Sequence, residues 1–289
     1  MTAPRTPVAS ETPRSPRPTV LVTGANSDIG LATIRSLLDL DAQVVATVRG
    51  ESGADAVRDG LRGHLLARVT IEFLDVTDAD TAELIIDRHM PDVVVNNAGA
   101  ALLGAVADIS DADALAQLQT MLIAPVRLAR LASVHQTVRG HGRIVNVSSV
   151  LADTLIPFTG WYGAAKAGLD SISDTLRLEL APAGIDVVTV QCGAVATGAW
   201  DDAADEVMAG ADELTASSRR RWADLTNLAK PLFEHPADVG ATIAEAALTP
   251  HPHAVYRVGF GSHLGIVTNL LPTRVSDLAT RLVMGLRNR

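Results

Sequence analysis

Two side chains that could transfer a proton stand four residues apart, Tyr162 and Lys166. In a helix, this spacing places both side chains on one face. A phenol has a reference pKa of about 10, and we expect the neighbouring ammonium to lower it by stabilising the phenolate. Tyr162 could then act as general acid toward a forming alkoxide, the proton transfer that accompanies hydride delivery to a ketone. Ser149, earlier in the chain, would hydrogen-bond the same oxygen and steady its developing charge.

A second group of residues could hold a phosphate-containing cofactor. A glycine-containing turn follows Thr23 and opens a predicted helix. Glycines in such a turn let the backbone approach a pyrophosphate, whose charge is favoured at a helix N-terminus. Taken alone, the motif is only moderately specific, because similar turns occur without a ligand. We expect the cofactor to contact Gly24, Asn26, Ser27, Asp28, Ile29 and Gly30.

The residues at the end of the second predicted strand bear on the choice of cofactor. Val48 stands where an NAD site usually places a carboxylate for the ribose hydroxyls, and Arg49 follows it. A missing acid beside a guanidinium favours a 2′-phosphate over a bare ribose. The alternative is that Arg49 is a solvated loop residue. We expect NADP(H) in preference to NAD(H).

Short runs rich in valine and isoleucine alternate with longer segments of helical periodicity. The nearly continuous hydrophobicity of the short runs predicts strands covered on both faces. The predicted strands are residues 19–23, 43–48, 70–74, 92–96, 143–147, 186–190 and 254–258. The predicted helices include residues 28–40, 115–139 and 162–181. This alternation predicts right-handed crossovers and an α/β fold with a doubly wound, mostly or fully parallel sheet.

Ligands of a doubly wound sheet bind beyond the carboxyl ends of its strands. Asp75 and Val76 follow the third predicted strand, where a carboxylate can contact an adenine amine. Asn97, Ala98 and Gly99 follow the fourth. We assign all five residues to cofactor binding.

Composition narrows the classes of partner. A net charge of −9 argues against a general nucleic-acid or anionic-membrane binder, since both need a basic surface. Cys192 is the only cysteine, which excludes an intrachain disulfide and a multi-cysteine zinc site. The histidines form no cluster with carboxylates or the cysteine, so we expect no metal. No apolar run approaches the ~20 residues that span a bilayer, and we expect a cytoplasmic protein without an integral membrane segment.

The chain is predicted to hold one folded domain. Residues 1–18 are rich in proline, serine, threonine and arginine and predict a disordered tail. The domain covers 19–289, with a substrate lid at 198–232 and a C-terminal segment for substrate or subunit contacts at 260–289. The lid contains a run of arginines, which we interpret as solvated: Arg219, Arg220 and Arg221.

In combination, these residues resemble the short-chain dehydrogenase/reductase family. The resemblance runs in order from residue 19 to 197 and includes the glycine turn, the Asp-Val pair, the segment 96–99, and Ser149 with Tyr162 and Lys166. Residues 192–197, Cys-Gly-Ala-Val-Ala-Thr, are similar to the family's Pro-Gly-x-x-x-Thr. The resemblance implies a Rossmann-like sheet of seven strands and a nicotinamide dinucleotide whose ribose also binds Lys166. It implies further cofactor contacts from Tyr162, Gly193, Val195 and Thr197.

Residues 160–182 and 270–273 are similar to the branch of the family that contains NADPH-dependent acyl-dihydroxyacetone-phosphate reductases. This similarity implies a hydrophobic, lipid-like or polyketide-like ketone as substrate. We expect the substrate pocket to include Met121, Leu151, Trp161 and Trp200. Structural packing accounts equally well for the two tryptophans.

Two positions depart from the family's pattern. Asp28 replaces a glycine of the cofactor turn; a carboxylate there suits the helix dipole, and we expect it to point outward and cap the helix. Met121 and Ala124 stand where the family usually has Asn-x-x-Gly, and Pro125 follows. The family's asparagine helps to hold a water chain that returns a proton to the tyrosine through the lysine, and methionine has no donor for this task.

These features predict an NADP(H)-dependent oxidoreductase that interconverts a small-molecule ketone and its alcohol. Met121 keeps open a non-redox enzyme, an isomerase, dehydratase or cyclase with a structural NADP(H). A catalytically weak cofactor-binding protein is a further alternative. The resemblance implies that the helices at 115–139 and 162–181 form the subunit interface of a homodimer or homotetramer.

Overall fold

A computed structural model of the chain describes residues 17–61, 63–209, 216–262 and 271–286. Seven strands form one sheet in the order β3-β2-β1-β4-β5-β6-β7, and every neighbouring pair is parallel. The strands are β1 Thr19–Thr23, β2 Gln43–Val48, β3 Val69–Phe73, β4 Val93–Asn96, β5 Gly142–Ser149, β6 Ile185–Cys192 and β7 Val255–Val258. The predicted doubly wound parallel sheet is confirmed, with strand ends shifted by one or two residues.

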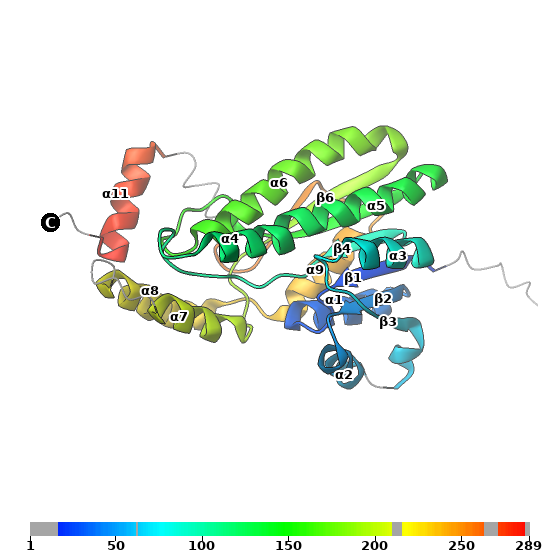
Figure 1. The fold of residues 1–289 in the computed structure, drawn as a ribbon, viewed down its shortest axis with the longest axis horizontal. Helices are drawn as coiled ribbons and strands as arrows, with labels where there is room; N and C mark the ends of the chain where they lie inside the picture. Colours follow the sequence, from blue (N-terminus) through cyan, green and yellow to red (C-terminus); the bar gives the residue numbers. More distant parts are fainter. Residues whose placement is uncertain (1–16, 62, 210–215, 263–270, 287–289) are drawn as a thin grey trace, which may run out of the picture.

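Helices cover both faces of the sheet (Figure 1). The first half of the chain contributes α1 Asp28–Asp39, α2 Glu51–Gly60, α3 Ala79–His89, α4 Asp111–Leu118 and α5 Ala124–Arg139. The second half contributes α6 Gly160–Leu180, α7 Ala199–Ala209, α8 Ala216–Ala229, α9 Pro236–Leu248 and α11 Thr273–Met284. Short 3-10 turns occupy Gly63–Arg68, Val150–Ala152, Ala181–Ala183 and Lys230–Leu232.

Side chains alternate across each strand, which divides the core into two layers. On one face, buried valines of β1, β5 and β6 pack against α1, α2 and α9. On the other face, alternate residues of the same strands pack against α3, α5 and the C-terminal part of α6. A third apolar cluster lies apart from these, where α7, α8 and α11 gather at one end of the molecule (Figure 1).

The predicted continuous helix over 115–139 is wrong in its middle. A π turn at Gln119–Ile123 separates α4 from α5. Pro125 has no N–H, so it cannot donate to the carbonyl of Met121 as the fifth residue of a regular α-helical turn would. The carbonyl that loses this bond lies within the π turn, which sets the position of Met121 near the sheet edge.

The N-terminal tail and the C-terminal segment fall only partly within the described residues. Residues 1–16 lie outside them, while Arg17 pairs with Asp41 at 2.7 Å and Pro18 accepts a bond from Gln43. Residues 210–215, 263–270 and 287–289 also lie outside the described part. No helix within the described part is long and apolar enough to cross a membrane.

Arg143, on β5, ties the sheet to the end of α9. Its guanidinium is buried and donates to the carbonyls of Ala246, Ala247 and Thr249 at 3.1, 2.9 and 2.7 Å. It also donates to the half-exposed carboxylate of Asp186 at 2.9 Å. A cation at a helix C-terminus satisfies carbonyls that have no partner within the helix.

We predict that Arg143→Met lowers the free energy of unfolding by about 3 kcal/mol, because the last carbonyls of α9 lose buried charged donors. The measurement is equilibrium unfolding in denaturant. Asp186→Asn is the matched control, and its effect should stay within about 1 kcal/mol because that carboxylate is half-exposed. Equal losses in the two variants would contradict a capping role for Arg143.

Candidate active site

The turn between β1 and α1 is too tightly packed for side chains at its glycines. Gly24 has a φ of +64°, and a Cβ there would lie 2.8 Å from the Cα of Ala98. A Cβ on Gly30 would lie 2.3 Å from the carbonyl oxygen of Gly24. The N-terminus of α1 therefore stands close to the end of β1 with its main chain accessible. Pyrophosphate binding at a helix N-terminus depends on a close main-chain approach of this kind.

The expectation that Asp28 caps α1 is wrong, because Ser27 is the capping residue. The hydroxyl of Ser27 accepts a hydrogen bond from the N–H of Gly30 at 3.0 Å and donates to the carbonyl of Gly24 at 2.9 Å. Asp28 occupies the first helical position, where its exposed carboxylate suits the helix dipole. Asn26 is also exposed, while Ile29 packs against the core.

A brace between β1 and β4 holds this turn, and sequence reasoning missed its key residue. The buried hydroxyl of Thr23 accepts hydrogen bonds from the main-chain N–H groups of Asn97 and Ala98, both at 3.0 Å. The amide of Asn97 donates to the carbonyls of Thr23 and Gly24 at 2.9 and 3.1 Å. The side chain of Asn97 thus bonds the cofactor turn itself. Threonine at a strand end was the one available signal for this role.

Arg49 and Asp75 lie near one another beyond the ends of β2 and β3. The Asp75 carboxylate accepts from the N–H and hydroxyl of Thr77 at 2.9 and 2.7 Å; these bonds, with Arg49 adding a smaller effect, lower the pKa of Asp75. Arg49 is exposed, and no ion pair within 4.0 Å holds it in the described part of the chain. Val76 is buried and its carbonyl accepts from Arg127.

Ser149, Tyr162 and Lys166 meet at the carboxyl end of β5. Ser149 ends β5, and its hydroxyl hydrogen-bonds with Tyr162 and accepts from the N–H of Leu151. Lys166 is buried one turn beyond Tyr162 on α6 and donates to the carbonyl of Val147 at 2.8 Å. Its Nζ lies 5.9 Å from the centre of the Tyr162 ring. The structure therefore brings together the three residues that the sequence marked for proton transfer.

Burial dominates the titration of this group. It raises the pKa of Tyr162 to about 12, against a lowering effect from the hydrogen bond with Ser149. It lowers the pKa of Lys166 to about 8. The expected lowering of the Tyr162 pKa is therefore wrong in direction, because the cost of burying a phenolate exceeds what its neighbours return. A phenol with this pKa stays protonated throughout the physiological range, as a proton donor must.

Met121 lies against the end of β4. Its side chain is buried, and a Cβ on Gly99 would come within 2.6 Å of its Cε. The Nε2 of Gln117 donates to the Met121 sulfur at 2.8 Å and to the carbonyl of Ala100 at 3.2 Å. Gln117 also accepts from the N–H of Leu102. Met121 thus fills space between the π turn and the strand end.

The segment after β6 runs toward the same edge of the sheet. A Cβ on Gly193 would lie 2.1 Å from the carbonyl oxygen of Phe260, so only glycine fits there. Val195 is buried and pairs with Glu234 in an isolated bridge. Thr197 is half-buried, and its N–H donates to the carbonyl of Val195 at 2.9 Å.

An apolar cluster joins Tyr162 to the helices at this end of the molecule. We call it the lid cluster; its buried members are Leu103, Phe158, Val207, Trp222 and Met284, with Ala101, Ala105, Ile156, Tyr162, Trp200, Ala223, Leu225 and Leu286 packed around them. Of the predicted pocket residues, Trp200 belongs to this cluster. Its indole donates to the carbonyl of Val195 at 2.7 Å, and its ring centre lies 5.0 Å from that of Phe233 in a tilted arrangement.

The remaining predicted pocket residues, Leu151 and Trp161, fall outside the lid cluster. Leu151 is half-buried in the turn after Ser149. Trp161 is half-buried at the start of α6, and its indole points toward the carbonyl of Val106 at 3.4 Å. The apolar members that come from loops and lid helices carry no periodic signal, and sequence reasoning missed them.

Arg219 corrects the interpretation of the arginine run. Arg220 and Arg221 are exposed, but Arg219 is 2% exposed and is not solvated. It pairs with Asp108 at 2.6 Å, donates to the carbonyl of Val207 at 2.9 Å and lies 5.4 Å from the ring of Phe158. A second link runs from the N–H of Leu103 to Glu206 at 3.0 Å. Both links tie α7 and α8 to the loop after β4.

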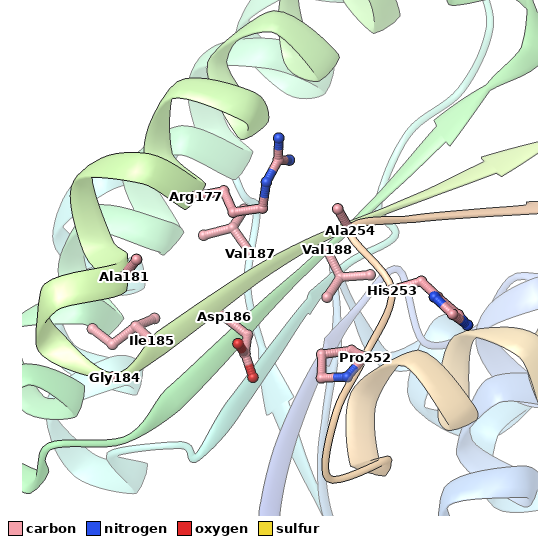
Figure 2. Close-up of a pocket in the computed structure, with 10 residues that line it drawn as sticks. All are labelled: Arg177, Ala181, Gly184, Ile185, Asp186, Val187, Val188, Pro252, His253 and Ala254. Atoms are coloured by element: carbon pink, nitrogen blue, oxygen red, sulfur yellow. The ribbon is translucent and has the colours of Figure 1, made fainter.

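A cavity of about 250 Å³ lies elsewhere, at the amino ends of β6 and β7 (Figure 2). It is lined in part by Arg177, Asp186 and His253. Ligands of a parallel sheet bind at the opposite, carboxyl edge, so this cavity is not the candidate active site. Among the described residues, no cluster of histidine, cysteine or carboxylate side chains could hold a metal ion.

Comparison with known proteins agrees with this arrangement. Within the curated proteins, the chain is 32% identical over 182 residues to the ketoacyl reductase HetN of Nostoc sp., covering 61% of this chain and 63% of that protein. It is 32% identical over 197 residues to the 3-oxoacyl-[acyl-carrier-protein] reductase FabG of Escherichia coli, covering 66% and 78%. It is 26% identical over 245 residues to a 3-ketodihydrosphingosine reductase of Bacteroides thetaiotaomicron, covering 83% and 87%.

Solved structures share the fold. A short-chain dehydrogenase from Streptomyces avermitilis matches with a TM-score of 0.75 at 24% identity, covering 95% of this chain and all of that one. One from Burkholderia cenocepacia, in complex with NADP, matches at 0.71 and 19% identity, covering 91% and 97%. The family model of the short chain dehydrogenases matches residues 18–207. The chain therefore belongs to the short-chain dehydrogenase family.

Proposed function

We propose that this protein is an NADP(H)-dependent ketoreductase that acts on a hydrophobic, lipid-like or polyketide-like ketone. The observation that carries the proposal is the position of the Tyr162 phenol, which lies between Ser149, Lys166 and the lid cluster. Such a group donates a proton to an oxygen that gains negative charge. The relatives named as ketoacyl and 3-oxoacyl reductases support a keto group as the reacting centre.

The residues at the sheet edge fit a nicotinamide dinucleotide. The close-packed glycines and the N-terminus of α1 would hold the pyrophosphate, and Asp75 with Val76 would lie at the adenine. Ala98, Gly99, Gly193, Val195 and Thr197 would flank the path to the nicotinamide. When bound, the nicotinamide supplies the hydride.

The protein's own residues would handle the proton and the developing charge. Tyr162 donates its phenolic proton to the substrate oxygen as that oxygen becomes an alkoxide. Ser149 hydrogen-bonds the same oxygen, and the Lys166 ammonium stabilises the phenolate that remains. The lid cluster packs apolar side chains beside Tyr162, which supports the choice of an apolar substrate class.

We predict that Tyr162→Phe lowers kcat for ketone reduction on the order of 10³-fold while leaving NADPH affinity unchanged, since only the proton donor is lost. NADPH consumption with a panel of acyl ketones measures turnover, and quenching of tryptophan fluorescence measures binding. Tyr256→Phe is the matched control, because Tyr256 lies on β7 beside His253. Unchanged reduction by the Tyr162 variant would contradict the assignment. Product formed without NADPH consumption would favour the non-redox reading that Met121 raises.

Arg49 is the residue that we propose to select NADP(H). Its guanidinium is exposed beyond β2, no carboxylate ends that strand, and Val48 packs instead against Gly53. We predict that Arg49→Ala raises the KM for NADPH about tenfold and leaves the KM for NADH nearly unchanged, because only the 2′-phosphate loses its partner. Arg58→Ala, on the adjacent helix α2, removes an equal charge and should change neither value. Equal effects on both cofactors would exclude this role.

We also propose that the protein is a homodimer or homotetramer through α5 and α6. Both helices carry exposed apolar side chains, with Val138 87% and Leu178 73% exposed. We predict that Val138→Asp lowers the mass measured by light scattering to that of a smaller species, because a buried carboxylate would destabilise the interface. Leu228→Asp, on α8, should leave the mass unchanged. A wild-type monomer would overturn this proposal.

A further inference from the structure

A group of polar side chains lies beneath α6, on the side of Lys166 away from Met121. Asp170 follows Lys166 by one helical turn, so Tyr162, Lys166 and Asp170 form one stripe on the helix. The Nε2 of Gln191, on β6, donates to the Asp170 carboxylate at 2.8 Å and to that of Asp153 at 2.9 Å. Of this stripe, the function proposed above uses Tyr162 and Lys166 and assigns no role to Asp170.

The position of Gln191 explains why the group is enclosed. Gln191 pairs with Ser148 across β5 and β6, and alternation along the strands places both on the face that α6 covers. Both side chains are buried. The amide oxygen of Gln191 has no hydrogen-bond partner within the described residues. Because buried polar groups normally have hydrogen-bond partners, we take the two carboxylates bonded by the Gln191 nitrogen to be the reason for a glutamine at this position.

We propose that Asp170 is a positioning residue whose carboxylate, oriented by Gln191, keeps Lys166 charged inside the closed site. This proposal rests on the proposed function only where it predicts an effect on the rate of ketone reduction. Three titratable groups face Lys166: Tyr162 and Asp170 from its own helix and Cys192 from β6. Asp153, from the turn after β5, faces Asp170.

Asp170 is the member of this set that can supply negative charge. Burial raises the pKa of Tyr162 and of Cys192 to about 12, so both are neutral near pH 7. Burial lowers the pKa of Lys166 to about 8 against opposing effects of Cys192 and Asp170, and of these two only the Asp170 carboxylate can be charged near pH 7. Burial also raises the pKa of Asp170, while the hydrogen bond from Gln191 favours its ionised form. Gln191 thus helps to maintain the charge that Lys166 needs.

The composition of the chain permits a direct test, because its lysines are Lys166 and Lys230 alone. Protein labelled with [ε-¹³C]lysine gives one signal for each, and Lys230→Arg assigns them. We predict that Lys166 titrates near pH 8 in the wild type and about one pH unit lower in Asp170→Asn. Asp153→Asn is the matched control: it removes the other carboxylate from the same Gln191 amide and should not lower the Lys166 midpoint.

A midpoint in Asp170→Asn equal to that of the wild type would overturn the proposal, as would equal lowering in the Asp153 variant. Should Asp170→Asn fail to fold by circular dichroism, Gln191→Met, of similar volume, provides the second test. It removes the orienting donor, and the Lys166 midpoint should again fall. An unchanged midpoint there would also count against the proposal.

The same shift should move the pH profile of ketone reduction. Lys166 is charged below its pKa, so the rate falls as pH rises through that value, and Asp170→Asn moves this fall to lower pH. NADPH affinity at pH 6 should match the wild type, since Lys166 is charged there in both proteins. The resonance test needs no substrate. If the wild-type protein reduces no ketone but Asp170→Asn shows the expected shift of the Lys166 midpoint, the proposed function is refuted and the inference about Asp170 stands.

Discussion

The ammonium of Lys166 is buried, and a buried charge is unfavourable unless its surroundings compensate for the lost water. The nearest compensation comes from the carbonyl of Val147 at 2.8 Å and the face of the Tyr162 ring at 5.9 Å. The first belongs to β5 and the second to α6, so the charge is stable only where this helix packs on this strand. Ala165 and Leu169, both buried on α6, fix that packing. The apolar contacts of α6 therefore determine where the proton donor stands.

The parallel sheet brings this group to the cofactor turn. Strand β4 lies between β1 and β5, so its end touches both halves of the site. Asn97, immediately after β4, bonds the turn at Gly24, and Gly99 meets Met121 at the start of the helix that packs beside α6. One strand end thus sets the spacing between the cofactor cradle and Tyr162. The lid cluster then covers this edge, held by the Arg219–Asp108 pair.

Sequence reasoning located the parts of this structure whose signals are local. The hydrophobic runs gave β1 and β2 at their observed bounds, and the other strands within two residues. Gly24 and Gly30 were recognisable because a close backbone approach admits no other residue. The pairing of Tyr162 with Lys166 follows from helical spacing alone. In each case a single segment of chain contains the whole pattern.

The features that escaped prediction depend on contacts between distant segments. Arg219 was taken for a solvated charge because nothing in residues 198–232 reveals Asp108, which lies 111 residues earlier. Asp170 and Gln191 each look ordinary until β6 and α6 pack together. The pKa of Tyr162 was predicted in the wrong direction because the i, i+4 lysine is visible in the sequence, whereas the depth of burial is not.

Contacts between distant segments also change the interpretation of Met121, which stands where the family usually has asparagine. Its side chain contacts Gly99 and the Gln117 amide, and neither contact can carry a proton toward Lys166. The opposite flank of Lys166 differs in character, because Gln191 there bonds both Asp170 and the half-buried Asp153. The polar surroundings of the lysine thus lie on the β6 side. A methionine in the π turn is compatible with a charged Lys166 because the groups that stabilise that charge belong to β5, β6 and α6.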